Sequence, residues 1–512
     1  MRLDELVAHA ARRHGDQPAV ADGRGTRSFA ELQARVARAA AALHALGLRP
    51  GGRLATLSRN RVELLELVLA ASRLGAAYVP LGFRLKPPEV GQLLADARPA
   101  LLLGEPDLLE AAAAALPPAL PVVPLGDAPG GWEARLAAAG APPPPAPAAA
   151  DDAVLQMYTS GTTGRPKGAL LSHGNLHSFL AVWREETRLS GPPERVHVGT
   201  PLFHVGGLVM SLTALSAGAC VSLHAEFDPQ CALATLADDA ITHALFVPAM
   251  LRWMLLDPDA RVRRYPALRL IVYGAAPIPP AQLADALHVF GCGFLQGYGL
   301  TETTGALTVL RPEDHVVPRD GEPAARLASA GRVLSCCELR VVDEQGRPVP
   351  AGHVGEVEAR GSNVTRGYWA QPQADAESFH DGWFRTGDLG VLDADGYLTL
   401  VDRSKDLILV GGENVYPRRA EEALLTHAAV ADAAVIGIPH AVWGEEVLAL
   451  VALKPGAAAG DRELIAHCRA TLSDTAGPTR VEFRDALPRN AAGKLDKRSL
   501  RAPYWAGRER RL

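Results

Sequence analysis

Short apolar runs alternate with helical stretches over most of this chain, and this alternation is the feature that most restricts its fold. Residues 28–46 open with Ser28 and Glu31 at capping-box spacing, repeat apolar residues with a helical period and stop at Gly47, which is typical of a helix. Residues 62–74 follow the same pattern and end before Gly75. Strand-forming runs lie between such stretches, at 77–81, 100–103, 154–157, 196–198, 219–223, 245–247, 270–272 and 294–295. The alternation predicts a layered α/β architecture.

The pattern of helical and strand-like segments changes twice in the last third of the chain. From Gly331 onward, β-rich segments separated by turns replace the alternation, at 338–342, 355–359 and 397–401. Beyond residues 402–406, helical stretches at 418–427 and 461–473 accompany strand-like runs at 431–437 and 448–453. The 512 residues are enough for two or three cores. We therefore expect a large domain of layered α/β subdomains plus a β-rich subdomain, and then, from about residue 402, a small α+β domain.

Composition and charge exclude several classes of protein. The chain is 48% hydrophobic and 21% charged, which is typical of a globular protein rather than a disordered one. Its net charge of −5 is spread along the sequence, without the basic stripe of a nucleic-acid binder or a polybasic membrane patch. No apolar run is long enough for a membrane span, and residues 1–20 carry charges throughout, unlike a signal peptide. No cysteines or histidines have zinc spacing, so we expect a cytoplasmic protein with free thiols.

Lysine is rare in this chain. Only six of the 52 basic residues are lysine, and arginine serves almost everywhere else. An ammonium group is a compact point charge on a flexible stem, and a planar guanidinium is not its equivalent at a phosphate. The positions that keep lysine are therefore candidates for a specific role. They are Lys86, Lys167, Lys405, Lys454, Lys494 and Lys497.

A loop rich in glycine and hydroxyl groups follows the apolar run at 154–157. Its sequence from Tyr158 to Ala169 is YTSGTTGRPKGA. Glycines let the backbone turn tightly and approach a ligand closely, while hydroxyls, free N–H groups and a lysine can bind phosphate oxygens. The spacing differs from the G-x-x-x-x-G-K-[ST] phosphate loop, because Pro166 precedes the lysine and Gly168 follows it. The residues expected to bind phosphate are Thr159, Ser160, Gly161, Thr162, Thr163, Gly164 and Lys167.

This loop resembles the signature of the adenylate-forming superfamily, which includes acyl-CoA synthetases, the adenylation domains of peptide synthetases and beetle luciferases. Other motifs of that family follow in order, so the resemblance covers nearly the whole chain. Residues 274–277 are similar to the family's adenine-side loop, formed here by Gly274, Ala275, Ala276 and Pro277. Residues 297–302 resemble the segment whose tyrosine stacks on adenine and whose Thr-Glu pair meets phosphate and magnesium. The matching residues are Gly297, Tyr298, Gly299, Thr301 and Glu302.

The resemblance continues into the last quarter of the chain. Asp388 and Arg403 match the family's ribose-binding acid and base, and Lys405 stands at its hinge. Gly411, Gly412, Glu413 and Asn414 resemble the loop that lines the thiol tunnel, and Lys494 matches the catalytic lysine. The resemblance implies an N-terminal AMP- and acid-binding domain over residues 1–402, a hinge over 403–406 and a mobile domain over 407–512. It also implies ATP, Mg²⁺ and coenzyme A, with Glu302 and Thr162 near the metal.

The chemistry of these residues agrees with that reading. A carboxylate and an ATP polyphosphate are both anions, so bringing them together requires cations and donors aimed at the developing charge. Lys494, Lys167 and a magnesium ion held by Glu302 would supply them, because Mg²⁺ commonly takes one or two carboxylates plus phosphates. Asp388 could accept hydrogen bonds from both ribose hydroxyls. Each residue alone is an ordinary surface acid or lysine, and their order along the chain carries the interpretation.

His204 lies where the family borders its carboxylate pocket. A lone histidine is more often structural than catalytic. Amino-acid-adenylating members have an aspartate here for the substrate ammonium, and the absence of an acid near His204 argues against an α-amino acid. By resemblance the other pocket residues are Val205, Gly207, Val209, Val247, Gly274, Gly299 and Gly305. They are small or aliphatic, which indicates a roomy apolar cavity for a fatty, aryl or polycyclic acid.

Three functions compete. The first is an acyl-CoA synthetase that forms acyl-AMP with pyrophosphate release and then transfers the acyl group to coenzyme A. The second is an adenylating enzyme that hands acyl-AMP to a carrier protein or partner enzyme. It is favoured by residues 475–480, where Arg480 is the single basic residue and the aromatic-Lys-x-Pro stretch of CoA-using members is absent. The third is a non-catalytic nucleotide-binding scaffold, which the presence of Lys167, Glu302 and Lys494 disfavours. We expect a monomer or homodimer whose partners are small molecules.

Overall fold

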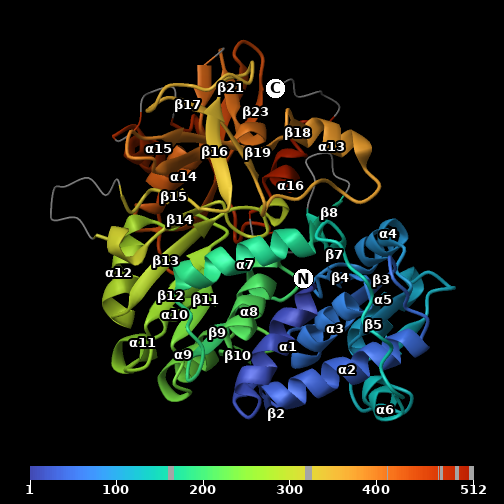
Figure 1. Cartoon of the computed structure of the whole chain (residues 1–512). Coiled ribbons are helices and arrows are strands. Elements are labelled where there is room, and N and C mark those ends of the chain that lie inside the picture. The colour runs from blue at the N-terminus through green and yellow to red at the C-terminus, as the bar shows by residue number, and fades with distance from the viewer. Residues whose placement is uncertain are drawn as a thin grey trace. The chain divides into compact units, whose positions relative to one another are not determined.

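The computed structural model describes residues 1–159, 166–316, 326–411, 413–470, 472, 477–489 and 495–506. The chain forms two compact units (Figure 1). Unit 1 contains Met1–Leu339 and Ala359–Phe384, and unit 2 contains Arg340–Glu358 and Arg385–Leu512. The domain boundary at residue 402 stays a prediction, because compactness alone does not define which segments move.

Two sheets with mainly parallel strands form the frame of unit 1. The six-stranded sheet has the order β6-β5-β3-β4-β7-β8 and the nine-stranded sheet the order β15-β14-β13-β12-β11-β9-β10-β1-β2. The first contains β3 (Arg53–Leu57), β4 (Ala77–Leu81), β5 (Leu101–Gly104), β6 (Val122–Pro124), β7 (Ala153–Thr159) and β8 (Lys167–Ser172). The second contains β1 (Pro18–Asp22), β2 (Gly25–Ser28), β9 (Arg195–Val198), β10 (Cys220–Leu223), β11 (His243–Phe246), β12 (Leu270–Gly274), β13 (Gly293–Tyr298), β14 (Thr308–Leu310) and β15 (Arg332–Val333).

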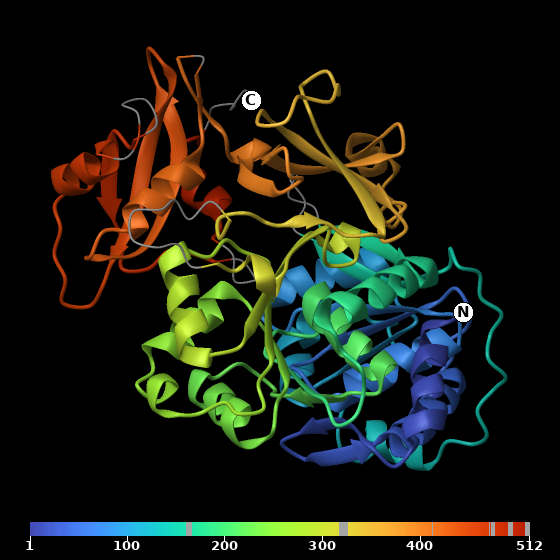
Figure 2. The ribbon, with the colours of Figure 1, turned by 60° about the vertical axis from the view of Figure 1, so that its left-hand side comes forward.

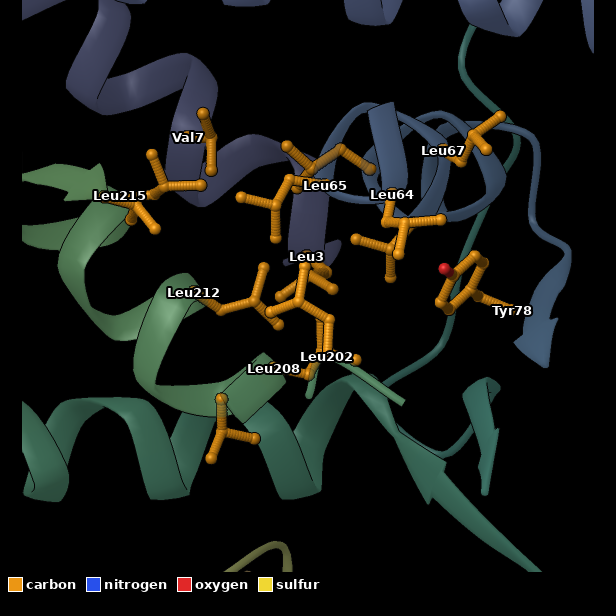
Figure 3. Packing of buried hydrophobic residues seen from close by; sticks show 14 of the residues in the cluster. Leu3, Val7, Leu64, Leu65, Leu67, Tyr78, Leu202, Leu208, Leu212 and Leu215 are labelled. Carbon is orange, nitrogen blue, oxygen red and sulfur yellow. The ribbon is translucent and has the colours of Figure 1, made fainter. Parts of the chain in front are cut away.

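A helical layer lies between these two sheets. One continuous core joins apolar residues of both sheets to helices of this layer (Figure 3). Leu3 and Val7, for example, pack in one cluster with Leu208 and with Tyr78 of β4. The layer consists of α1 (Leu3–His14), α2 (Phe29–Ala45), α3 (Val62–Arg73), α7 (His173–Thr187) and α8 (Val205–Ala217), with the short α6 (Trp132–Ala137) against α2.

The outer faces of both sheets have helices of their own. A second core covers the nine-stranded sheet with α9 (Pro229–Asp238), α10 (Pro248–Leu256), α11 (Asp259–Val262) and α12 (Pro280–Phe290). A further core covers the six-stranded sheet with α4 (Pro87–Ala97) and α5 (Pro106–Ala112). The strands therefore read as continuous apolar runs, since alternate side chains enter different cores. In β5, Leu101 and Leu103 face the inner core and Leu102 the outer one.

A five-stranded sheet has the order β16-β17-β19-β18, with β20 pairing β19. Its strands are β16 (Cys337–Val342), β17 (Val354–Gly361), β18 (Phe379–His380), β19 (Trp383–Leu392) and β20 (Leu398–Arg403), and α13 (Pro372–Ser378) precedes β18. These strands form the β-rich part that the turn-separated segments after Gly331 predict.

The C-terminal part of unit 2 is a small α+β body. Its sheet is ordered β22-β21-β24-β23, with β25 pairing β24, and the long strands β23 and β24 stand out in orange in Figure 2. The strands are β21 (Ile408–Val410), β22 (Glu413–Val415), β23 (Val430–His440), β24 (Gly444–Leu453) and β25 (Arg480–Phe483). The helices are α14 (Pro417–Leu425), α15 (Asp461–Arg469) and α16 (Lys497–Arg501). The α+β prediction for this segment is confirmed.

The N-terminal cap that the sequence predicts for one helix is present in the structure. The helix predicted over residues 28–46 is α2, and the Glu31 N–H donates to Ser28 Oγ at 3.2 Å while the Ser28 N–H donates to Glu31 Oε2 at 2.7 Å. The layered α/β prediction is likewise confirmed. No helix in the described ranges is long and apolar enough to cross a membrane.

The buried ion pairs of Glu66 contribute to the stability of unit 1. Glu66 of α3 is fully buried, and its Oε1 contacts Arg35 Nε of α2 at 2.6 Å and Arg27 Nη1 at 3.1 Å. Arg35→Met should lower the free energy of unfolding by about 3 kcal/mol, because it removes one cation from a carboxylate that stays buried. Urea denaturation measures the effect. Arg261→Met, which breaks the exposed pair with Asp285, should change stability little, and an equal loss in both variants would contradict the expectation.

Candidate functional site

The loop predicted to bind phosphate begins at the end of β7 and ends at the start of β8, two strands that pair as a hairpin. Antiparallel pairing places Thr159 opposite Lys167 and Tyr158 opposite Gly168. Lys167 is buried, at 8% exposure. The space beside Gly168 is tight, since a Cβ there would lie 3.0 Å from the Gln156 amide nitrogen. The predicted residues Ser160, Gly161, Thr162, Thr163 and Gly164 lie outside the described residues.

Glu302 is brought to the base of this hairpin. It lies in a short 3-10 turn, Thr301–Thr303, and is 6% exposed. Its Oε1 accepts hydrogen bonds from Thr159 Oγ1 at 3.3 Å and from Tyr368 Oη at 2.9 Å. The predicted phosphate loop and the predicted magnesium ligand, which are 143 residues apart in sequence, are therefore in direct contact.

Tyr368 is a residue that the sequence interpretation missed. Its hydroxyl donates to Glu302, and its ring lies 5.0 Å from Lys167 Nζ, within range of a cation–π interaction. Burial, together with the nearby Glu302 charge, raises the pKa of Tyr368, so the hydroxyl keeps its proton and can donate. Tyr368 also bridges Ala169 through the backbone. A tyrosine after Gly367 has no distinctive spacing, so nothing in the sequence separates it from a core aromatic.

A network of side-chain contacts supports β7, the first strand of this hairpin. Tyr158 donates to Asp96 Oδ2 at 2.5 Å, and the Gln156 amide donates to Tyr158 Oη at 2.9 Å. Arg53 Nε in turn donates to Gln156 Oε1 at 2.8 Å, and its guanidinium lies 3.3 Å from the centroid of the Trp369 ring. Trp369 Nε1 completes the set by donating to the Asp96 carbonyl at 3.1 Å. The strand that begins the loop is thus supported by side chains from three other segments.

The predicted adenine-side segments lie at the ends of neighbouring parallel strands. β12 ends at Gly274, which pairs with Gly297 of β13. A Cβ on Gly274 would lie 2.2 Å from the Gly297 carbonyl oxygen, so this close approach requires glycine. Ala275 follows with a left-handed φ of 67° and turns the chain into Ala276 and Pro277. Tyr298, the predicted adenine-stacking residue, ends β13 and is 9% exposed.

Four of the predicted acid-pocket residues lie in α8 or at its start. His204 is the N-cap of this helix, half-buried, with its ring 4.2 Å from that of Phe203. Val205, Gly207 and Val209 lie on the first turns, and Val247 caps α10.

The pocket glycines have different surroundings. A Cβ on Gly207 would lie 2.6 Å from the Pro201 carbonyl oxygen, and one on Gly299 would lie 2.5 Å from the Ala306 Cα. At both positions glycine permits close backbone packing. Gly305 has a φ of 119°, and a Cβ there would lie 3.4 Å from Val209 Cγ2 and from the Phe179 ring.

The other predicted site residues that the structure describes lie in unit 2. Asp388 of β19 pairs with Arg403 of β20, and Arg403 Nε lies 2.7 Å from Asp388 Oδ1. Lys405 lies in the turn Ser404–Asp406, where burial and the neighbouring Arg403 lower its pKa. Gly411, Glu413 and Asn414 lie on the β21–β22 hairpin. Gly412 and Lys494 are outside the described residues.

The chemistry of the Glu302 site fits magnesium held jointly with a phosphate ligand. No group of three potential metal ligands among His, Cys, Asp and Glu occurs in the described part of the chain. Glu302 offers carboxylate oxygens, and its described hydrogen bonds both run to Oε1. A magnesium ion here would take most ligands from ATP phosphates and water, which is common for Mg²⁺.

Tyr368→Phe tests the hydroxyl contact to Glu302. The substitution keeps the ring against Lys167, so we expect binding of MgATP to weaken about three- to tenfold, less than the full effect of a lost hydrogen bond to a charged group because Glu302 itself remains. Isothermal titration measures the Kd. Tyr265→Phe, which removes a hydroxyl bound to the Ala260 carbonyl, is the matched control and should leave the Kd unchanged. Equal affinities of Tyr368→Phe and the parent chain would contradict the expected role.

Comparisons with known proteins agree with this geometry. Residues 7–369 match the family model for the AMP-binding enzymes, and residues 419–494 match the model for their C-terminal domain. Feruloyl-CoA synthase from Amycolatopsis sp is 40% identical over 98% of this chain and 100% of that protein. The fatty acid–acyl-carrier-protein ligase ScoC from Streptomyces coeruleorubidus is 37% identical over 100% and 98%. ATP-bound MatB from Rhodopseudomonas palustris superposes with a TM-score of 0.88 at 33% identity, over 98% of this chain and 99% of MatB. The chain therefore belongs to the AMP-binding enzymes, as an acid–thiol ligase of the acyl-CoA synthetase branch of the adenylate-forming superfamily.

Proposed function

We propose that this enzyme activates a non-amino carboxylic acid with ATP and transfers the acyl group to coenzyme A. The observation that carries the proposal is the contact of Glu302 with Thr159 and Tyr368, beside the buried Lys167. A buried carboxylate, a buried lysine and Thr159, the first hydroxyl residue of the predicted loop, lie close together there, as binding of a metal–polyphosphate requires. Relatives that are named CoA ligases support the same reaction.

The first half-reaction joins two anions. A carboxylate oxygen of the acid attacks the α-phosphorus of ATP, the bond from that phosphorus to the bridging oxygen breaks, and pyrophosphate leaves. Lys167 and Lys494 supply positive charge to the phosphate oxygens as charge builds up. Glu302 and Thr162 would hold magnesium, which neutralises part of the polyphosphate charge.

The second half-reaction forms the thioester. The thiol sulfur attacks the acyl carbonyl carbon of the mixed anhydride, the thiol proton is released, and the carbon–oxygen bond to AMP breaks. Asp388 accepts hydrogen bonds from the ribose hydroxyls of the nucleotide, and Gly411–Asn414 border the path of the thiol. Rotation of residues 407–512 about Lys405 withdraws Lys494 between the two steps.

The acid is proposed to be a fatty or other bulky apolar one. His204 stands at the head of α8, and the neighbouring pocket residues Val205, Val209 and Val247 are aliphatic. Such a wall favours an uncharged chain or ring over a polar side chain. The relatives named for a hydroxycinnamoyl and a fatty acyl group are consistent with this range.

A carrier protein is the second candidate for the acyl acceptor. The structure adds one observation in its favour: Arg480, the single basic residue of 475–480, lies 3.2 Å from Glu482 and 3.6 Å from Glu446. Its charge is already shared with two carboxylates, which reduces its attraction for CoA phosphates. The ligase named for an acyl carrier protein supports this alternative.

Lys494→Ala tests the catalytic lysine. We expect ATP–pyrophosphate exchange to fall at least about 100-fold, because the transition state loses a positioned cation. Lys454→Ala, at an exposed lysine that donates to the Ala428 carbonyl, should exchange at the parent rate. Unchanged exchange in Lys494→Ala would contradict the assigned role.

AMP release identifies both the acid and the acceptor. The enzyme is incubated with ATP and ferulate, decanoate, benzoate or L-phenylalanine, each with and without CoA. We expect sustained AMP release only with CoA and a non-amino acid, since the amino acid finds no carboxylate for its ammonium group. Release that is no faster with CoA but rises with an acyl carrier protein would support the second candidate instead.

A further inference from the structure

Lys497 is a buried lysine that the proposed reaction does not use. It is one of only six lysines in the chain and the first residue of α16. Its Nζ lies 2.7 Å from Glu421 Oε1 of α14, and both side chains are 13% exposed. A charge in such a place needs close partners, because an unpaired buried ion is strongly destabilising.

The charges of three acidic residues act on this ammonium. Besides Glu421, it is attracted to Asp402 and Asp406, which lie on either side of Lys405. Burial alone would lower the pKa of Lys497, but the attraction of these carboxylates outweighs it, and the net pKa is raised. Glu421 Oε1 also accepts the backbone N–H of Val435 at 2.7 Å, which fixes the carboxylate against β23.

The same helices hold the segment around Lys405. Asp402 Oδ2 accepts the N–H of Arg418 at the start of α14 at 2.8 Å. Arg501, on α16 with Lys497, donates to Asp406 Oδ1 at 2.5 Å and to the Lys405 carbonyl at 3.2 Å. Residues on both sides of Lys405 are therefore tied to α14 and α16.

The residues on the two sides of positions 490–494 contact each other. Arg489 and Leu495 form an antiparallel bridge, and the Asp496 N–H donates to the Pro488 carbonyl at 2.9 Å. Arg489 also pairs with Asp432 at 2.6 Å. Lys497 follows Leu495 by two residues, so its ion pair with Glu421 anchors the chain just after this bridge onto α14.

We propose that Lys497 is a positioning residue that couples the Lys494 segment to the hinge, through Glu421, Asp402 and Asp406. The hinge orientation is then transmitted toward Lys494, because α16 contacts α14 through Lys497 and the residues around Lys405 through Arg501. The proposal rests on the proposed function, in which Lys494 serves adenylation and Lys405 is the pivot. Lys497 should consequently matter for the half-reaction that uses Lys494 and little for the half-reaction that does not.

The test compares Lys497→Met and Glu421→Gln with Lys454→Met, a lysine of the same unit outside this cluster. Adenylation is measured by ATP–pyrophosphate exchange with the panel acid that gives the fastest AMP release. Thioester formation is measured separately, from the purified adenylate of that acid and CoA. Melting temperatures report the folded fraction, and Lys497→Arg shows whether the charge suffices.

We expect Lys497→Met to slow exchange about 10- to 100-fold and thioester formation less than about threefold, with Glu421→Gln affected in the same direction. Lys497→Arg should lie between Lys497→Met and the parent chain, and Lys454→Met should match the parent. Adding Lys497→Met to Lys494→Ala should cause no further loss of exchange, since Lys497 acts through Lys494.

Equal losses in both half-reactions, in proportion to a loss of folded protein, would overturn the proposal and leave Lys497 as a stability residue. Normal exchange in folded Lys497→Met would overturn it as well, while a defective Lys494→Ala leaves the proposed function intact. Normal exchange in Lys494→Ala would instead refute the proposed role of Lys494, on which the inference rests.

Discussion

Parallel strands that are buried on both faces require a layer of helices on each face, and unit 1 is built on this requirement. β5 shows it at the scale of single residues, because Leu101 and Leu103 enter the inner core while Leu102 enters the outer one. Once both faces are covered, strand ends are the places where polar loops can reach a ligand. Thr159, Gly274 and Tyr298 are all the last residues of strands, and each belongs to a predicted nucleotide-binding segment.

Each unit contains its own group of buried or paired charges. In unit 1 a buried lysine and a buried glutamate are held near each other by one tyrosine, which contacts both. In unit 2 the Asp388–Arg403 pair and the cluster around Lys497 organise the segment around Lys405. Charges that are buried and paired in this way have few alternative positions, so they suit sites where a reacting group must be placed accurately.

Sequence patterns predicted much of the secondary structure and of the site. The Ser28–Glu31 capping box marks the start of α2, and the apolar runs coincide with strands because their residues are buried on both faces. The motifs also indicated the family, since glycines, hydroxyls and lysine in one loop have few other uses. The sequence did not predict that Tyr368 is part of the site, because a tyrosine that packs in a core and one that contacts a site carboxylate share the same sequence pattern. Arg480 could be noted as a lone basic residue, but its two carboxylate partners could not be foreseen.

By itself, the sequence determined the elements, their alternation, the order of the motifs and the types of group available for catalysis, because periodicity, capping and loop composition act over a few neighbouring residues. Only the tertiary structure decided which charges meet. Thr159, Glu302 and Tyr368 converge from segments more than 60 residues apart, and Lys497 meets Glu421 across 76 positions, 497 minus 421. Such encounters depend on how strands and helices pack, and the free energy of a buried ion pair depends on every group around it.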